Sequence, residues 1–142
     1  MYWGLAVPQV AFGAIVYFLI STRTEPADYD LALMLQKVVL FLVPVSMATG
    51  YFLFKRLVGG IDPKLSLEEK LQRYFAPLLI RSALLEVAFF FCCVCALITG
   101  VQLFLFVTPI IFLVFLLLRP TPGAMTTDLQ LTSDEAARLM PR

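Results

Sequence analysis

The sequence contains no histidine and few charged residues, and both shortages exclude whole classes of site. Histidine is the commonest general base near neutral pH, the commonest metal ligand and the usual haem ligand. Charged residues make up only 15% of the 142 residues and the net charge is +1, so the chain offers no strongly basic surface to nucleic acid. We therefore expect no enzymatic activity, no cofactor and no nucleic-acid partner.

Cysteine is also scarce, and its placement limits what it can do. Cys92, Cys93 and Cys95 lie in one apolar run. Residues so close on one helix cannot form a normal disulfide framework. Two thiols one turn apart, without His, Asp or Glu nearby, fall short of the usual four-ligand zinc or iron–sulfur site. We interpret the three as small packing residues and expect no bound metal.

Apolar residues are in excess, at 61% of the chain against roughly 45–50% in ordinary soluble domains. A soluble fold of this size cannot bury so much apolar surface, so lipid must be the solvent for most of it. A span of about 20 apolar residues crosses a hydrocarbon core about 30 Å thick, and four runs approach that length: 3–20, 31–54, 75–98 and 101–118. The sequence predicts an all-α integral membrane bundle of four transmembrane helices over residues 1–120, followed by a polar cytoplasmic tail over 121–142.

Basic residues between the second and third runs set the expected orientation. That segment carries five of them, whereas 21–30 has one arginine among three acidic residues. The positive-inside rule places the basic segment and both termini in the cytoplasm, and 21–30 outside. We expect a multi-pass protein of the bacterial cytoplasmic (inner) membrane, with Tyr2, Trp3 and Tyr51 as interface anchors.

Three local patterns predict where helices begin and end. Ser66 and Glu69 have the spacing of a capping box, so a helix is expected to start there. It should run as a short amphipathic ramp along the lipid headgroups into the third span, with a kink at Pro77. Gly100 suits the left-handed residue that ends the third span.

The tail after residue 120 is polar and is expected to contain one short helix. The run 119–123 contains two prolines and a glycine and is predicted to interrupt helix. Thr132 and Glu135 predict a second capping box, opening a short helix that ends near Leu139. So small a segment has no core of its own and should be ordered only by docking.

Glu86 is the residue in the chain with the strongest functional signal. It lies about eight residues into the third span, or ~12 Å into the bilayer, where an unpaired carboxylate costs several kcal/mol. Arg81 is five residues away, so the two side chains point about 140° apart and should not pair within one helix. Arg81 either snorkels to the inner headgroups or meets Glu86 of another subunit. Depth counting assigns five more polar residues to the layer of Glu86: Gln9, Ser46, Thr49, Ser82 and Thr108.

Two interpretations of this layer stay open. In the first, the polar groups hydrogen-bond between helices and fix packing, each contributing about 0.6 to 2 kcal/mol. In the second, Glu86 is a proton or ion site, since ionisable residues inside membranes are commonly functional. We favour the first, because one carboxylate without a second titratable group nearby makes a poor relay.

Several runs resemble a group of small bacterial four-helix membrane proteins of unknown function: 69–74 (EKLQRY), 78–86 (LLIRSALLE) and 118–121 (LRPT). The resemblance covers most of the chain and implies no activity. A shorter likeness, Ala83-Leu84-Leu85-Glu86, is to the second helix of the rotor (c) subunit of ATP synthase, and it implies a proton-binding role for Glu86. The span 31–54 departs from that family, because it lacks the repeated glycines of rotor helices.

These observations favour a non-enzymatic membrane component, either an accessory or assembly subunit or a self-associating bundle. Its expected partners are the lipid bilayer and other membrane subunits or further copies of the chain. The alternative is a small ion-coupled transporter or proton-conducting protein that uses Glu86.

The orientation is testable by single-cysteine labelling in a background without the native thiols. Cysteines introduced at Lys64 or Ser133 should resist a membrane-impermeant reagent in sealed cells, because the positive-inside rule places both in the cytoplasm. A cysteine at Glu25 should react. Labelling of Ser133→Cys from outside would contradict the predicted topology.

Overall fold

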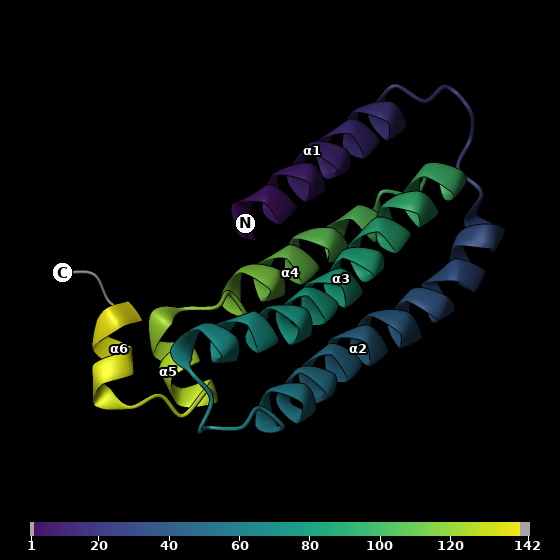
Figure 1. Cartoon of the computed structure of the whole chain (residues 1–142). Helices are drawn as coiled ribbons and strands as arrows, with labels where there is room; N and C mark the ends of the chain where they lie inside the picture. The colour runs from purple at the N-terminus through teal and green to yellow at the C-terminus, as the bar shows by residue number, and fades with distance from the viewer. Residues whose placement is uncertain (1, 140–142) are drawn as a thin grey trace.

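The computed structural model describes residues 2–139, and the secondary structure in that range is all helical. In chain order the helices are α1 (Tyr2–Ser21), α2 (Tyr29–Gly59), α3 (Leu67–Thr99), α4 (Leu103–Leu117), α5 (Pro122–Asp128) and α6 (Ser133–Leu139). The first four lie side by side, and α5 and α6 gather at the end of the bundle where α3 begins (Figure 1). The prediction of an all-α fold is confirmed.

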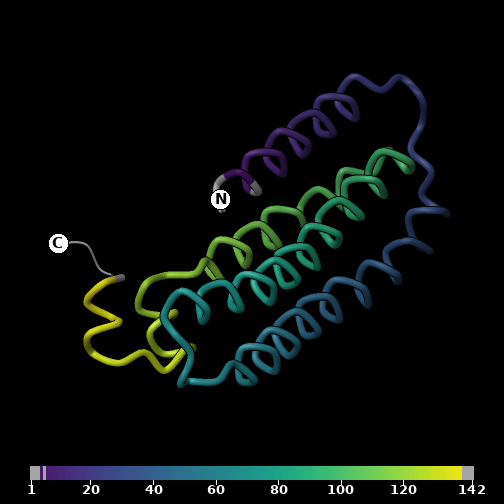
Figure 2. Tube along the Cα trace, in the orientation of Figure 1, coloured from purple at the N-terminus to yellow at the C-terminus, as the bar shows by residue number. Residues whose placement is uncertain are grey.

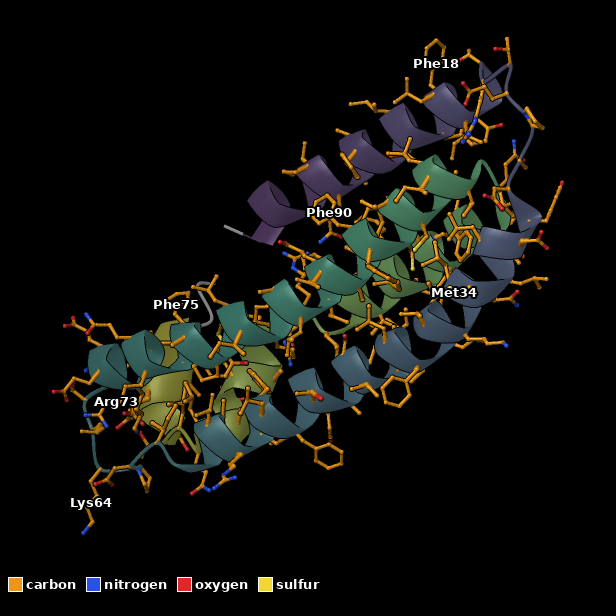
Figure 3. The ribbon with its side chains drawn as sticks, turned by 90° about the vertical axis from the view of Figure 1, so that its right-hand side faces the viewer. Phe18, Met34, Lys64, Arg73, Phe75 and Phe90 are labelled. Carbon is orange, nitrogen blue, oxygen red and sulfur yellow. The ribbon has the colours of Figure 1, made fainter. Side chains whose placement is uncertain are left out.

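Helix α3 is the centre of the bundle. α2, α4 and α1 all pack against it, and α1 touches α4 at fewer positions. The trace in Figure 2 shows that α1 and α3 run in the same direction, while α2 and α4 run in the opposite one. α1 and α2 lie on opposite sides of α3 (Figures 1 and 3), so the helices surround α3 only in part.

Two of the described helices, α2 and α3, are long and apolar enough to cross a membrane. α4 and α5 together make a third candidate span, bent by 69° at the break between them. In α1 the described apolar segment Ala6–Ser21 is shorter than a full span. Large apolar side chains cover the outside of these helices, for example Phe18, Phe41, Phe52 and Phe106 at 66–72% exposure. Such a surface is compatible with lipid and costly in water.

The third predicted span and the ramp before it form one continuous helix of 33 residues. Its capping box is confirmed: Glu69 N–H donates to Ser66 Oγ, and Ser66 N–H donates to Glu69 Oε2 at 3.2 Å. The helix continues through Pro77 (Figure 1). Lys70 and Tyr74, on its first turns, are buried. The segment is amphipathic as expected: Gln72 and Arg73 are exposed, whereas other parts of the chain cover Lys70 and Tyr74.

The opposite end of α3 is closed by a glycine and an arginine. Gly100 has φ of 71°, which confirms the left-handed cap. Arg23, from the loop after α1, donates through Nη1 to the carbonyls of Leu97 at 3.0 Å and Ile98 at 3.4 Å. A guanidinium at this end also meets the negative pole of the helix dipole. Arg23 thus fixes the first loop on α3.

The polar tail docks on its own bundle. Thr121 caps α5, accepting from Ala124 N–H at 3.2 Å, and Pro122 occupies the first turn, a pattern that initiates the helix the sequence analysis missed. Leu129, only 4% exposed, packs in an apolar cluster with residues of α2 and α3: Phe54, Val58, Tyr74 and Leu78. The capping box of Thr132 and Glu135 is confirmed. Residues 140–142, and the side chains of the expected anchors Tyr2 and Trp3, lie outside the described part of the chain.

Charged and polar contacts hold the tail against the first turns of α3 and the last turns of α2. Lys70 Nζ lies 3.0 Å from Glu135 Oε1, and the lysine side chain is only 2% exposed. Lys55 Nζ lies 3.1 Å from Asp128 Oδ1, and Tyr74 donates to the other Asp128 oxygen at 3.4 Å. The backbone N–H of Thr132, and then Lys70, hold the pKa of Glu135 below its ordinary value. A lowered pKa means that both contacts of the Glu135 carboxylate, the cap of α6 and the pair with Lys70, are present at neutral pH and are lost as the pH falls through the acid range.

Removing the two partners of the buried pair should have unequal effects. Glu135→Gln leaves the Lys70 ammonium buried without a counter-charge, so the tail should undock and residues 121–139 should be cleaved several-fold faster by an added protease. Lys70→Met replaces the buried cation with an apolar chain and leaves Glu135 free to reach water. It should keep the tail docked, and the double variant should restore protection. Equal protection of Glu135→Gln and wild type would contradict the assignment.

Candidate functional site

Two side chains between α1 and α3 have unmet hydrogen-bonding capacity. Gln9 of α1 is 1% exposed, and neither its amide nitrogen nor its amide oxygen has a hydrogen-bond partner. Glu86 of α3 is half-buried, and its Oε1 is buried without a partner. These three atoms are the buried side-chain polar atoms without a partner among the residues that the structure describes. Each such group costs about 1–3 kcal/mol, which makes this place unusual.

Ring contacts between α1 and α3 show that Gln9 and Glu86 share one level. The rings of Phe12 and Phe90 lie 5.0 Å apart, and a Cβ on Gly13 would lie 3.3 Å from Cζ of Phe89. Gln9 lies one turn before Gly13, and Glu86 lies one turn before Phe90. Because the two helices are parallel, both steps go the same way along the bundle. Gln9 and Glu86 are therefore neighbours across the α1–α3 contact.

Arg81 lies on another side of α3. Its guanidinium donates through Nη2 to the carbonyl of Leu118 at the end of α4, and its Cζ lies 4.0 Å from the centre of the Phe54 ring of α2. The side chain is 7% exposed. It thus neutralises the carbonyl end of α4 and makes a cation–π contact. Arg81 joins three helices instead of reaching to the headgroups as one interpretation expected.

The remaining residues of the predicted layer are spread around the bundle. Ser46 is buried on α2, across α3 from α1. Thr49 is exposed on the outside of α2, where it lines a shallow groove with Arg56, so it does not belong to a buried layer. Counting residues from the end of a helix gives the depth of a side chain in the membrane but not the direction in which it points. The predicted layer therefore included side chains that α3 separates from Glu86 and Gln9.

Ser82 and Thr108 are both buried, but only Ser82 is close to Glu86 in the helix. Ser82 lies one turn before Glu86 on α3 and is 3% exposed. Thr108 donates its hydroxyl to the carbonyl of Leu105 in its own helix, at 2.8 Å. The candidate site therefore consists of Gln9, Glu86 and, on the adjoining turn, Ser82.

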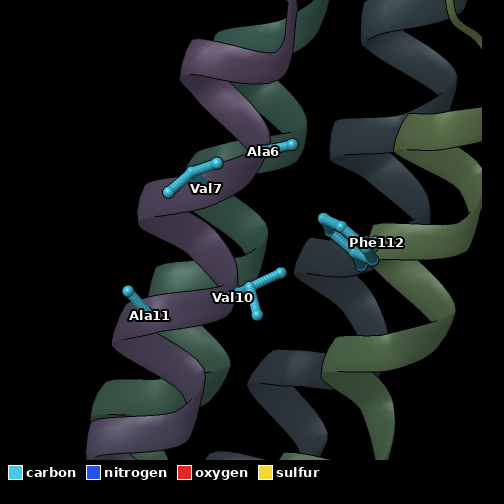
Figure 4. Close-up of a pocket in the computed structure, with 5 residues that line it drawn as sticks. All are labelled: Ala6, Val7, Val10, Ala11 and Phe112. Atoms are coloured by element: carbon cyan, nitrogen blue, oxygen red, sulfur yellow. The ribbon is translucent and has the colours of Figure 1, made fainter.

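An apolar groove runs beside α1 on the α4 side. Ala6, Val7, Val10 and Ala11 form one wall and Phe112 the other, and the groove has a volume of about 320 Å³ (Figure 4). No polar surface lines it. It suits a hydrocarbon chain and carries no chemistry of its own.

The cysteines do not contribute a metal site within the described part of the chain. Cys92, Cys93 and Cys95 are buried and free. Residues 2–139 contain no group of three or more His, Cys, Asp or Glu side chains able to hold a metal ion. Their burial in the core agrees with the packing role.

The chain matches no family model, no curated protein and no solved structure. A glutamine offers one acceptor and two donors, and a carboxyl group accepts or donates according to its protonation. The site can bind a hydrogen-bonding or cationic group in an apolar setting.

Removing the unmet groups should stabilise the isolated protein. Gln9→Leu with Glu86→Leu replaces polar atoms that lack partners by apolar atoms of similar volume, so the free energy of unfolding in detergent should rise by about 1–3 kcal/mol. Thr108→Val serves as the control, because it removes a hydroxyl that already has a partner and should bring no gain. A less stable double variant would show that the two side chains already bond each other.

Proposed function

We propose that this protein is a non-enzymatic, multi-pass component of a bacterial cytoplasmic membrane, either an accessory or assembly subunit or a self-associating bundle. The observation that carries the proposal is the unmet carboxyl oxygen of Glu86 beside the unmet amide of Gln9. Polar atoms without partners do not stabilise an isolated bundle, whereas a helix packed against α3 can supply a donor to the half-buried carboxyl group of Glu86.

The proposed topology has four spans, with α1 and α4 crossing beside α2 and α3. In support, α1 is a helix of 20 residues that runs parallel to α3 along the bundle. The basic residues near the α5–α6 end support a cytoplasmic location for the tail and for the loop before α3. Tyr51, 48% exposed on α2, is placed as an interface anchor in this topology. The resemblance to small four-helix bacterial membrane proteins supports the same arrangement.

The second candidate is a small ion-coupled or proton-conducting protein that uses Glu86. It is supported by the same buried oxygen and by the likeness of residues 83–86 to the rotor helix. Against it, the titratable side chains of α2 all lie at least seven residues from its midpoint, that of α1 in the described residues is near the end of the helix, and α4 has none; the side chains concerned are Tyr17, Tyr29, Asp30, Lys37, Tyr51, Lys55 and Arg56. A proton path needs successive sites, and these do not form one through the middle of the bundle.

Two measurements separate these functions. Mild solubilisation of native membranes should recover the protein in a fixed ratio with the subunits of a larger membrane complex, or as an oligomer of its own copies. Purified protein in vesicles should conduct protons no faster than Glu86→Gln, because Gln keeps the shape and abolishes titration. Proton flux that depends on Glu86, with no stoichiometric association, would reverse the ranking.

A further inference from the structure

One face of α3 is left uncovered by the described helices. It is formed by exposed residues at helical spacing: Ala76, Leu79, Ile80, Ala83, Val87 and Val94. α1 packs on one side of this face through Phe89 and Phe90, and α2 packs on the other through Arg81 and Leu84. Figure 3 shows α3 between α1 and α2. We call these six residues the open face of α3.

Glu86 lies at the edge of the open face, on the side of α1. It directly precedes Val87, which is 57% exposed, and it is itself half-buried. Its carboxyl group therefore sits at the boundary between the bundle and its surroundings, near the middle of α3. A carboxyl group that meets lipid hydrocarbon at this depth has no favourable contact there.

Among the described residues, no basic side chain forms an ion pair with Glu86. The basic side chains of α1–α4, in the described residues, are Lys37, Lys55, Arg56, Lys70, Arg73 and Arg81. Lys55 and Lys70 pair with acidic residues of the tail, and Arg81 contacts the end of α4 and the Phe54 ring. Arg56 and Arg73 lie toward helix ends, and Lys37 lies 13 residues along α2 from Gly50, the residue that packs against Arg81 and Leu84. A second copy brings the same set, so charge complementarity favours a different protein.

We propose that the open face of α3 docks a transmembrane helix of another protein that carries a basic residue at mid-membrane depth, and that this residue binds the half-buried carboxyl group of Glu86. The inference deepens the proposed function and rests on it, since it names the chemistry of the partner subunit. A lysine ammonium brings three donors, and the half-buried carboxyl group of Glu86 has a second oxygen that can accept while Oε1 stays buried. Ala83 lets a partner backbone approach closely one turn from Glu86.

Defined helices test this docking without the natural partner. The protein carries a fluorophore on Lys64→Cys, in the exposed loop, with the three native thiols replaced by alanine. Twenty-residue Leu/Ala peptides with a central Lys, Leu or Glu carry an acceptor dye, and energy transfer in vesicles reports binding. The Lys peptide should bind roughly three- to thirtyfold tighter than the Leu peptide, the range of one interhelical polar contact. The Glu peptide should show no gain.

Variants of the protein locate the contact. Glu86→Gln should reduce Lys-peptide binding to the level of the Leu peptide, and Ala83→Phe should do so while leaving Glu86 in place. Adding Val45→Glu to Glu86→Gln moves the carboxyl group to the outside of α2 and should not restore binding. Circular dichroism and thermal stability confirm that each variant folds.

Equal binding of the Lys and Leu peptides to wild type would overturn the proposal and leave lipid as the cover of the open face. Restoration by Val45→Glu would overturn it too, by showing attraction to any buried carboxyl group. Either result is distinguishable from failure of the proposed function. Stoichiometric recovery from native membranes is a separate readout, and it can succeed through another surface.

Discussion

Polar groups in an apolar medium are stabilised only when they have hydrogen-bonding or charged partners. Several such contacts in this structure are made by side chains of α3. Lys70 pairs with Glu135, Arg81 binds the carbonyl end of α4 and the Phe54 ring, and Thr99 donates to the carbonyl of Cys95. Each contact ties α3 to another segment or closes its own backbone. Glu86 is the exception within this helix, because its inner oxygen has no partner. This contrast is why Glu86 is the candidate functional residue of α3.

Arginine closes the carbonyl ends of two helices in this bundle, at opposite ends of the molecule. Arg23 reaches from the loop after α1 to the end of α3, and Arg81 reaches from α3 to the end of α4. The last carbonyls of a helix have no partners within it, so a guanidinium offers them both donors and a compensating charge. Together with the docked tail, these contacts leave the sides of the bundle free for lipid or for another helix.

Much of the local structure was predictable, because it depends on residues close in sequence. The capping boxes of Ser66 with Glu69 and of Thr132 with Glu135 are complete within four residues, and Gly100 adopts its conformation for want of a Cβ. The tail was harder. Thr121 and Pro122 start α5, although the run 119–123 is predicted only to interrupt helix. Lys70, Tyr74 and Leu78 share a face whose burial under Leu129 depends on contacts between distant segments.

The sequence by itself determined the helical class, the apolar surface and the singular position of Glu86, since these follow from composition, from hydrophobic runs and from depth along one helix. Only the tertiary structure decided which polar residues meet. Depth counting placed Gln9, Ser46, Thr49 and Thr108 at one level, yet the packing of α1 on α3 brings Gln9 alone of these beside Glu86. The physical reason is that the position of a residue along its helix follows from the sequence, whereas packing between helices decides which side of each helix contacts its neighbours.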